Sequence, residues 1–472
     1  MTATLTNLPF EADLDLIRRL DRNGPRYTSY PTADRFVDSF GADAYKSWMA
    51  RQPIGDSAGE QRALSIYVHL PFCSTVCFYC ACNKVITANK ARGVEYLRYL
   101  KNEIELHGTL FHYKPRVEQM HWGGGTPTFF DTAQLAALND TLRRRFDFAP
   151  GGEYSIEIDP RTVSEESIKA LHAMGFNRLS LGVQDFDSDV QRAVNRVQSE
   201  AQTLNIIAAA RQAGFHSINI DLIYGLPLQN PDTFDRTLTS VITARPDRVA
   251  VYNYAHLPAR FKSQRRIHDN ELPAPETKLK LLALAAQRLT GAGYVYIGMD
   301  HFALPHDALA VAQREGRLHR NFQGYSTHAD CDLLALGVSA IGAIGPTYSQ
   351  NTRDLSDYYE HIERGELPIV RGIELSTDDR LRRAVIQALM CQFELSAVAI
   401  EAMESSYLIV FKEYFKWELV DLRNLAQAGL IEPGDGRITV TPKGRMLIRN
   451  VCMVFDKYLQ NQPEIARYSR VI

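Results

Sequence analysis

The stretch SIYVHLPFCSTVCFYCACNK, residues 65–84, decides the fold of this 472-residue chain. It starts with SIYVHL, which favours a β-strand, and continues into a loop that carries Cys73, Cys77, Cys80 and Cys82 in the spacing C-x3-C-x2-C-x-C. In α/β proteins, binding residues gather at the carboxyl ends of parallel strands. The four cysteines are therefore predicted to lie at the carboxyl end of the first strand of such a sheet.

Short apolar runs rich in β-branched residues alternate with longer amphipathic stretches after this strand. This alternation is typical of βα units around a parallel sheet. The predicted strands are 65–70, 118–122, 153–159, 178–184, 217–225, 248–254 and 295–299, and the predicted helices include 131–146, 200–213 and 275–290. Six or seven units predict an α/β fold with a TIM-like barrel, either closed or incomplete as (β/α)6, with a doubly wound sheet as the alternative.

Three parts are predicted along the chain. Residues 1–60 form an irregular arm with helical pieces, residues 61–375 form the barrel, and residues 376–472 form a mainly helical C-terminal domain. Within the last part, residues 429–459 are predicted to form a hairpin followed by a helix, much like a winged-helix unit. Because the charge of the chain is unremarkable, we expect this unit to serve packing rather than DNA binding.

The composition excludes several classes of protein. A net charge of -2 gives no sign of a surface for nucleic acid or anionic membranes. No apolar run approaches the ~20 residues that span a bilayer. The start of the chain, MTATLTNLPFEADLDL, lacks the basic-then-apolar order of a secretory signal. A cytoplasmic protein is therefore expected, without nucleic-acid or membrane partners and with reduced thiols.

The clustering of the cysteines predicts a metal site. Four of the seven lie within residues 73–82, whereas Cys331, Cys391 and Cys452 are scattered and expected to be inert and buried. Thiolates suit zinc or iron–sulfur sites. A structural zinc site normally takes ligand pairs from two separated segments, and no second pair follows here. The loop therefore favours an iron–sulfur cluster with one open iron, with a four-cysteine zinc site or a disulfide as the alternatives.

Two further features fall at predicted strand ends. The stretch HWGGGTPT, residues 121–128, follows the second strand, and its glycines would let the backbone approach a ligand closely. Alone it could be only a tight turn, but beside the cysteine loop it is expected to hold a cofactor. Tyr67, at the end of the first strand, could equally be a core residue. Glu157 needs a partner, because a carboxylate in such a position is rarely left unpaired.

These features together resemble the radical S-adenosylmethionine superfamily, whose signature is C-x3-C-x2-C in the loop after the first barrel strand. Along nearly its whole length the chain resembles one family of that superfamily, the oxygen-independent coproporphyrinogen III oxidases. The matching stretches are GPRYTSYPTA, YVHLPFCSTVCFYCACNK, HWGGGTPT, IEIDPR, RLSLGVQDF, NIDLIYGLP, YNYAHLP, IGMDHFA, HRNFQGYST, GVSAIG, KGRMLIRN and RYSRVI.

The resemblance implies the cofactors and the residues that hold them. It implies one [4Fe-4S] cluster with three cysteine ligands, Cys73, Cys77 and Cys80. It also implies two molecules of S-adenosylmethionine. The first molecule, bound to the cluster, would contact Tyr67, Gly124, Glu157 and Ile341. The second would contact Gly125, Thr126, Gln184, Arg196, Asp221 and Ala255, and Tyr79 would also line the cofactor site.

The resemblance further implies the reaction. Radicals of 5′-deoxyadenosine would remove hydrogen from two propionate side chains of coproporphyrinogen III. Loss of carbon dioxide and one electron from each would give the vinyl groups of protoporphyrinogen IX, in anaerobic heme biosynthesis. The residues implied in catalysis are Cys82, Tyr67 and Glu157, and those implied on the substrate side are Phe322 and Gln323. The arm residues Arg26, Tyr27 and Tyr30 are expected to close over the porphyrinogen.

The expected partners are the porphyrinogen and an electron donor such as flavodoxin, and the chain is expected to be a monomer. Three alternatives remain: a heme-trafficking protein with the same cysteine loop, a radical enzyme that opens heme or transfers a methyl group, and a structural zinc protein. Cys82 and the stretch GPRYTSYPTA, residues 24–33, favour the oxidase, since heme-trafficking relatives usually lack both.

Overall fold

The computed structural model describes residues 14–51, 62–403, 410–460 and Tyr468. Its main sheet has the strand order β16-β15-β14-β13-β1-β4-β5-β6-β7-β8-β10-β9. Six successive strands in this order run parallel, namely β1 (Leu64–Leu70), β4 (Arg116–Gly124), β5 (Asp147–Ile158), β6 (Arg178–Gln184), β7 (Ser217–Tyr224) and β8 (Arg248–Asn253).

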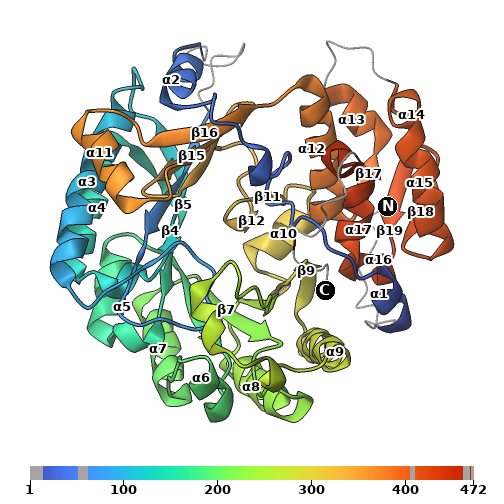
Figure 1. The fold of residues 1–472 in the computed structure, drawn as a ribbon, viewed down its shortest axis with the longest axis horizontal. Coiled ribbons are helices and arrows are strands. Elements are labelled where there is room, and N and C mark those ends of the chain that lie inside the picture. The colour runs from blue at the N-terminus through green and yellow to red at the C-terminus, as the bar shows by residue number, and fades with distance from the viewer. Residues whose placement is uncertain (1–13, 52–61, 404–409, 461–467, 469–472) are drawn as a thin grey trace.

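Helices cover the outer face of these six strands (Figure 1). They are α3 (Lys90–Gly108), α4 (Thr132–Arg145), α5 (Glu165–Ala173), α6 (Ser188–Ala193), α7 (Glu200–Ala213) and α8 (Pro231–Ala244). Alternation along β1 explains the layering, because Ile66, Val68 and Leu70 are fully buried in the core between sheet and helices. Gly214 ends α7 with a φ of 100°, the left-handed conformation that glycine adopts without strain. The predicted incomplete (β/α)6 barrel is confirmed.

The edges of the sheet differ from the prediction. The strand predicted at 295–299, β9 (Val295–Gly298), is not a seventh parallel neighbour, because the antiparallel β10 (His301–Ala303) lies between it and β8. At the other edge, β13 (Asp332–Leu336) pairs in parallel with β1. Three antiparallel strands then extend the sheet, namely β14 (Ile341–Ile344), β15 (Thr347–Asn351) and β16 (Ile369–Glu374). The sheet therefore stays open, with β9 and β16 at its two edges.

A second apolar core lies in the C-terminal part. The helices α12 (Thr377–Gln392) and α17 (Ile448–Val454) pack together, and β18 (Ile431–Gly434) and β19 (Arg437–Val440) form the predicted hairpin. The other helices of this region are α13 (Ala397–Met403), α14 (Phe411–Tyr414), α15 (Lys416–Gln427), α16 (Pro442–Met446) and α18 (Lys457–Gln460), and β17 (Glu394–Ser396) completes a three-stranded sheet. The hairpin followed by a helix is therefore confirmed.

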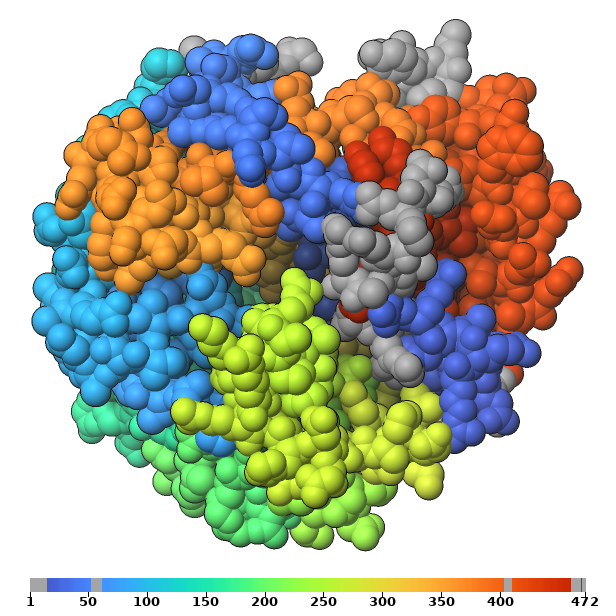
Figure 2. Space-filling model, viewed as in Figure 1, coloured from blue at the N-terminus to red at the C-terminus, as the bar shows by residue number. Residues whose placement is uncertain are grey.

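The N-terminal arm crosses between the two cores, and Figure 2 shows a hollow at the centre of this face. The arm contains α1 (Leu14–Leu20) and α2 (Ala42–Arg51). That Tyr27 and Tyr30 close over a substrate stays a prediction. Both are buried in the C-terminal core, where the hydroxyl of Tyr27 donates to Asp456 Oδ2 at 3.0 Å. Arg26 points the other way and pairs with Asp300 beside β10.

The remaining elements are short, apart from one helix. They are β2 (Phe72–Cys73), β3 (Val85–Ile86), α9 (Pro275–Gly291), α10 (Ala308–Arg314), β11 (His319–Asn321), β12 (Gly324–Ser326), α11 (Leu355–Glu363) and the 3-10 turns at 33–35, 127–129, 160–162, 262–266 and 269–271. Within the described ranges, no helix is both long enough and apolar enough to cross a membrane.

A buried carboxylate fastens α3 to the far edge of the barrel. Glu103 is fully buried and accepts three hydrogen bonds at 2.7 Å, from the hydroxyl of Tyr358, the backbone N–H of Gly337 and the amide of Asn351. Burial raises the pKa of Glu103 to about 7, although these three donors oppose the shift. Glu103 is therefore protonated in the folded protein at pH values where it is ionised in the unfolded chain.

The raised pKa of Glu103 predicts a pH-dependent stability. The unfolded carboxyl ionises near its ordinary value and the folded one near pH 7, so its contribution is complete at low pH and declines as pH rises between those values. Replacing Glu103 with glutamine should remove this decline. We expect the free-energy difference between wild type and Glu103→Gln to shrink by roughly 2–3 kcal/mol between about pH 5 and about pH 8, measured by denaturant unfolding. Glu95→Gln, at an exposed position of the same helix, is the control, and a pH-independent difference would contradict the argument.

Candidate active site at the cysteine loop

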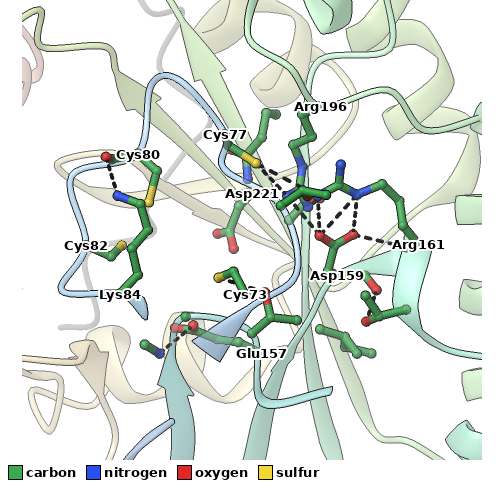
Figure 3. Close-up of a pocket in the computed structure, with 18 of the residues that line it drawn as sticks. Cys73, Cys77, Cys80, Cys82, Lys84, Glu157, Asp159, Arg161, Arg196 and Asp221 are labelled. Carbon is green, nitrogen blue, oxygen red and sulfur yellow. Dashed lines mark hydrogen bonds and ion pairs between the residues drawn. The ribbon is translucent and has the colours of Figure 1, made fainter. Parts of the chain in front are cut away.

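A cavity of about 600 Å³ opens at the carboxyl ends of the parallel strands (Figure 3). Its walls come from the cysteine loop after β1, the glycine turn after β4 and the ends of β5, β6 and β7. The four clustered cysteines, Cys73, Cys77, Cys80 and Cys82, all line it. The sequence prediction that these motifs share one edge of the sheet is confirmed by this arrangement.

The cysteine loop is held in place by backbone hydrogen bonds. Cys73 lies in β2, which pairs in parallel with β3, and the N–H of Phe78 donates to the carbonyl of Val194 at 2.9 Å. Cys80 N–H donates to the carbonyl of Cys77 at 3.2 Å, which closes the turn between these two residues. All seven cysteines of the chain are free thiols, and only Cys331 among the three scattered ones is partly exposed rather than buried.

The thiols of the loop differ in pKa because their surroundings differ. A hydrogen bond with Cys82 and the positive charge of Lys84 lower the pKa of Cys80 to about 6, against the effect of burial. Burial raises the pKa of Cys73 to about 11. The Sγ of Cys77 accepts from Arg196 Nη1 at 3.5 Å. Because the thiolate is the form that binds metal, positive donors beside the loop suit a thiolate-ligated group.

The arrangement of these thiols fits a cluster better than a single ion. Among the described residues, no three His, Cys, Asp or Glu side chains are close enough together to bind one metal ion. Zinc takes four ligands at about 2.0–2.3 Å around one point. In an iron–sulfur cluster each thiolate binds a different iron, and the thiols are correspondingly farther apart. Three thiols around one cavity match that requirement.

The glycine turn connects the cysteine loop to Glu157. The backbone N–H of Gly124 donates to Glu157 Oε2 at 3.2 Å, and His121 Nε2 lies 3.2 Å from Glu157 Oε1. Desolvation raises the pKa of Glu157, but the contacts with His121 and Gly124 outweigh it, and the net pKa lies below its ordinary value. Glu157 is therefore an ionised acceptor in the cavity wall. Within the protein its partners are His121 and Gly124, and the contact with a cofactor stays a prediction.

Sequence reasoning missed a charge cluster formed by Asp159, Arg161 and Arg196 (Figure 3). Arg161 Nη2 lies 2.6 Å and Arg196 Nη1 3.1 Å from the same carboxylate oxygen of Asp159. Burial raises the pKa of Asp159, but the two guanidinium groups outweigh it and leave the pKa below its ordinary value. The signal was present in the sequence, because Asp159 ends the third predicted strand and Arg161 follows two residues later.

Asp221 also lines the cavity. It accepts from the hydroxyl of Ser180 at 3.0 Å and from the amide of Asn219 at 2.9 Å. Burial, followed by the negative charge of Glu157, raises the pKa of Asp221 to about 6. The cavity thus contains an ionised carboxylate on β5 and a carboxyl group with a raised pKa on β7, with β6 between them. Such a contrast is common in binding and catalytic sites.

The structure brings together most of the predicted site residues. Those that line the cavity are Cys73, Cys77, Tyr79, Cys80, Cys82, Gly124, Gly125, Thr126, Glu157, Gln184, Arg196 and Asp221. Tyr67 is not among the residues that line the cavity. It lies in the middle of β1 rather than at its end, its hydroxyl is 3.0 Å from His69 Nδ1, and its ring stacks on His121.

Four other predicted residues lie outside the cavity lining. Phe322 packs edge-on against Tyr348, with ring centroids 5.7 Å apart, and Ile341 belongs to the same small apolar cluster. The side-chain nitrogen of Gln323 is buried without a hydrogen-bond partner among the described residues. The carbonyl of Ala255 accepts a hydrogen bond from a neighbouring glutamine side chain at 3.2 Å. The same glutamine, Gln264, also donates to the carbonyl of Tyr79 in the cysteine loop at 2.9 Å. The roles of these four residues stay predictions.

Comparisons with known proteins agree with this geometry. Residues 67–241 match the family model of the radical SAM superfamily. The chain is 50% identical to an oxygen-independent coproporphyrinogen III oxidase of Pseudomonas aeruginosa and 48% identical to one of Escherichia coli, with 98% of each chain covered in both pairs. The solved structure of coproporphyrinogen III oxidase (HemN) from Escherichia coli, a radical SAM enzyme, superposes with a TM-score of 0.89 at 47% identity, covering 96% of this chain and 100% of that one. The chain belongs to the oxygen-independent coproporphyrinogen III oxidase family of radical SAM enzymes.

Proposed function

We propose that this protein converts coproporphyrinogen III to protoporphyrinogen IX in heme biosynthesis. Two propionate side chains become vinyl groups, and each loses a hydrogen atom, carbon dioxide and one electron. The observation that carries the proposal is the match over 98% of both chains to enzymes of that name at 48–50% identity. The cavity at the cysteine loop supports it, because it offers thiol ligands and a polar wall in one place.

The family uses an iron–sulfur cluster and S-adenosylmethionine, and we propose which residues hold them. Cys73, Cys77 and Cys80 would bind three irons of a [4Fe-4S] cluster. Two molecules of S-adenosylmethionine are proposed, one contacted by Gly124 and Glu157 and one by Gly125, Thr126, Gln184, Arg196 and Asp221. All of these residues line the cavity, which supports the assignment. When bound, the cluster and S-adenosylmethionine supply a 5′-deoxyadenosyl radical by one-electron cleavage.

The protein's own groups would position these molecules. Glu157 already accepts a hydrogen bond from Gly124, so its carboxylate and the glycine turn form one rigid wall for the positively charged end of the first molecule. Arg196 is 7% exposed, and it would hold the cysteine loop through Cys77 while offering charge to a carboxylate in the cavity. Walls of this kind orient reactants and exclude water from reactive species.

We also propose the cellular setting. The protein would act as a cytoplasmic monomer, with a flavodoxin-like protein as its electron donor and without nucleic-acid or membrane partners. A net charge of -2 supports the absence of a nucleic-acid surface. The three-part division into arm, barrel and C-terminal domain remains a prediction. Size-exclusion chromatography with light scattering tests the monomer directly, and a dimer at micromolar concentration would contradict it.

The function is tested by an anaerobic assay. The cluster is reconstituted, dithionite, S-adenosylmethionine and coproporphyrinogen III are added, and products are followed by mass spectrometry. We expect protoporphyrinogen IX together with 5′-deoxyadenosine. Formation of 5′-deoxyadenosine without any decarboxylation of the porphyrinogen would contradict the substrate assignment and favour the heme-trafficking or heme-opening relatives.

Glu157 offers a sharper test of the cofactor wall. Changing Glu157 to glutamine keeps the shape of the side chain but removes the negative charge that Gly124 and His121 face. We expect the dissociation constant for S-adenosylmethionine to rise about tenfold or more, because a charge-assisted hydrogen bond is lost. Equilibrium dialysis with the reconstituted protein measures it. The exposed Glu166→Gln serves as the control, and equal affinity in Glu157→Gln and wild type would refute the role.

A further inference from the structure

The hairpin of β11 and β12 carries a buried guanidinium group, that of Arg320. Arg320 is 3% exposed, and its Nε and Nη1 have no hydrogen-bond partner among the residues that the structure describes. Within the described part of the chain its side chain forms no ion pair. Its backbone is held firmly, since Gln387 bonds both the N–H of Arg320, at 3.1 Å, and its carbonyl, at 2.7 Å. The cation is therefore fixed in place while its donors are left open.

A second buried polar group without a hydrogen-bond partner among the described residues lies on the other side of Tyr325. The guanidinium of Arg320 sits over the ring of its cross-strand partner Tyr325, with the carbon atom 4.7 Å from the ring centre. The ring of Tyr325 in turn meets His301 edge-on at 5.4 Å, and Nδ1 of His301 is buried without a hydrogen-bond partner in the described residues. Burial and the charge of Arg320 lower the pKa of His301 to about 3, so its imidazole is neutral.

The carboxylate beside this group is already engaged. Asp300 precedes His301 and pairs with Arg26 of the arm, and its side chain is 12% exposed. Asp300 forms an ion pair with Arg26, and no described carboxylate forms an ion pair with Arg320. The described residues around Arg320 therefore leave its positive charge without an anion. A buried cation without an anion is unfavourable unless a ligand supplies the missing charge.

Aromatic contacts connect this place to the cysteine cavity. Tyr252 lines the cavity, and its ring meets His301 edge-on with centroids 5.8 Å apart. A chain of side-chain contacts thus leads from the cavity wall to the buried cation, through Tyr252, His301, Tyr325 and Arg320. Figure 1 shows the β11–β12 hairpin in the centre of the molecule, between the barrel strands and α12. An anion bound at Arg320 would belong to a ligand that extends well beyond the cavity.

We propose that Arg320, assisted by His301, forms a binding site for a carboxylate of the substrate. The inference rests on the proposed function and deepens it, because the ligand would be a propionate of coproporphyrinogen III remote from the one that reacts. Two of the four propionates survive in the product and can serve as lasting anchors. A guanidinium group is suited to this task because it can hold both oxygens of a carboxylate.

The test uses the full-length protein and coproporphyrin III, the air-stable oxidised form of the substrate, with its tetramethyl ester as a ligand without carboxylates. We expect Arg320→Met to weaken binding of the tetra-acid about tenfold or more, measured by fluorescence titration, and to leave binding of the ester unchanged. Arg320→Lys should be intermediate. Arg317→Met, an exposed arginine three residues away, is the matched control and should bind like wild type.

A purely structural arginine would behave differently. Its loss would lower the melting temperature, whereas removal of an unpaired buried cation should leave it within about 2 °C of wild type or higher. In the reconstituted enzyme, Arg320→Met should raise the KM for coproporphyrinogen III about tenfold with kcat nearly unchanged. If Arg320→Met leaves both ligand binding and KM unchanged, the inference about Arg320 is overturned, while the proposed function still stands. Failure of the wild-type holoenzyme to convert coproporphyrinogen III would instead overturn the proposed function.

Discussion

Cys77→Ser is expected to lose the iron–sulfur cluster and to lower activity by more than about a thousandfold. The thiol of Cys77 is buried, and its Sγ faces both Arg196 at 3.5 Å and Arg161 at 3.8 Å. Serine is a hard oxygen ligand whose hydroxyl stays protonated, so it cannot replace a thiolate on iron. Iron and acid-labile sulfide per chain, together with the visible absorption band of the reconstituted protein, measure the loss.

Cys331→Ser is the matched control for this experiment. Cys331 is also a free and partly buried cysteine, and burial raises its pKa to about 12, so its thiol stays protonated. We expect this variant to take up iron and sulfide like wild type and to retain full activity. A Cys77→Ser protein with the iron content and turnover of the control would rule out Cys77 as a ligand.

The barrel could be predicted from sequence because the pattern of each βα unit lies within one short stretch of the chain. Alternation in β1 buries Ile66 and Val68, and the glycine at 214 ends a helix in the left-handed conformation. The far edges of the sheet could not be predicted in the same way. The strand β10 has only three residues, His301–Ala303, and its antiparallel position depends on tertiary pairing with β8. Short strands of this kind carry too few residues to show a period.

The candidate site was predictable where a motif is continuous along the chain. The cysteine spacing and the glycine turn each lie in one loop, so their common position at the sheet edge follows from topology. Side-chain pairings between segments that lie far apart in the chain could not be predicted from the sequence. Asp159 meets Arg196 across 37 positions, and Arg26 meets Asp300 across 274. The arm shows the same limit, because the hydroxyl of Tyr27 donates a hydrogen bond to Asp456 in the C-terminal core.

Gly125→Ala should disable the site without unfolding the protein. A Cβ atom at residue 125 would lie 2.5 Å from the backbone carbon and oxygen of Pro71 and 2.9 Å from the backbone nitrogen of Phe72. These are main-chain atoms at the start of the cysteine loop, and they cannot rotate away as a flexible side chain would. The N–H of Gly125 also donates to the carbonyl of Leu70 at 2.9 Å. The methyl group must therefore push the glycine turn and the cysteine loop apart.

This displacement should reduce cluster occupancy and lower activity about a hundredfold or more, since misplacement of reacting groups by about 1 Å already has effects of that size. The control is Gly151→Ala, because a Cβ atom there meets nothing within 4 Å. We expect Gly151→Ala to match wild type in iron content and turnover, and both variants to keep the far-ultraviolet circular dichroism of wild type. Normal activity in Gly125→Ala would show that the loop can shift without loss of function. The close contact between the glycine turn and the cysteine loop would then not be what positions the reacting groups.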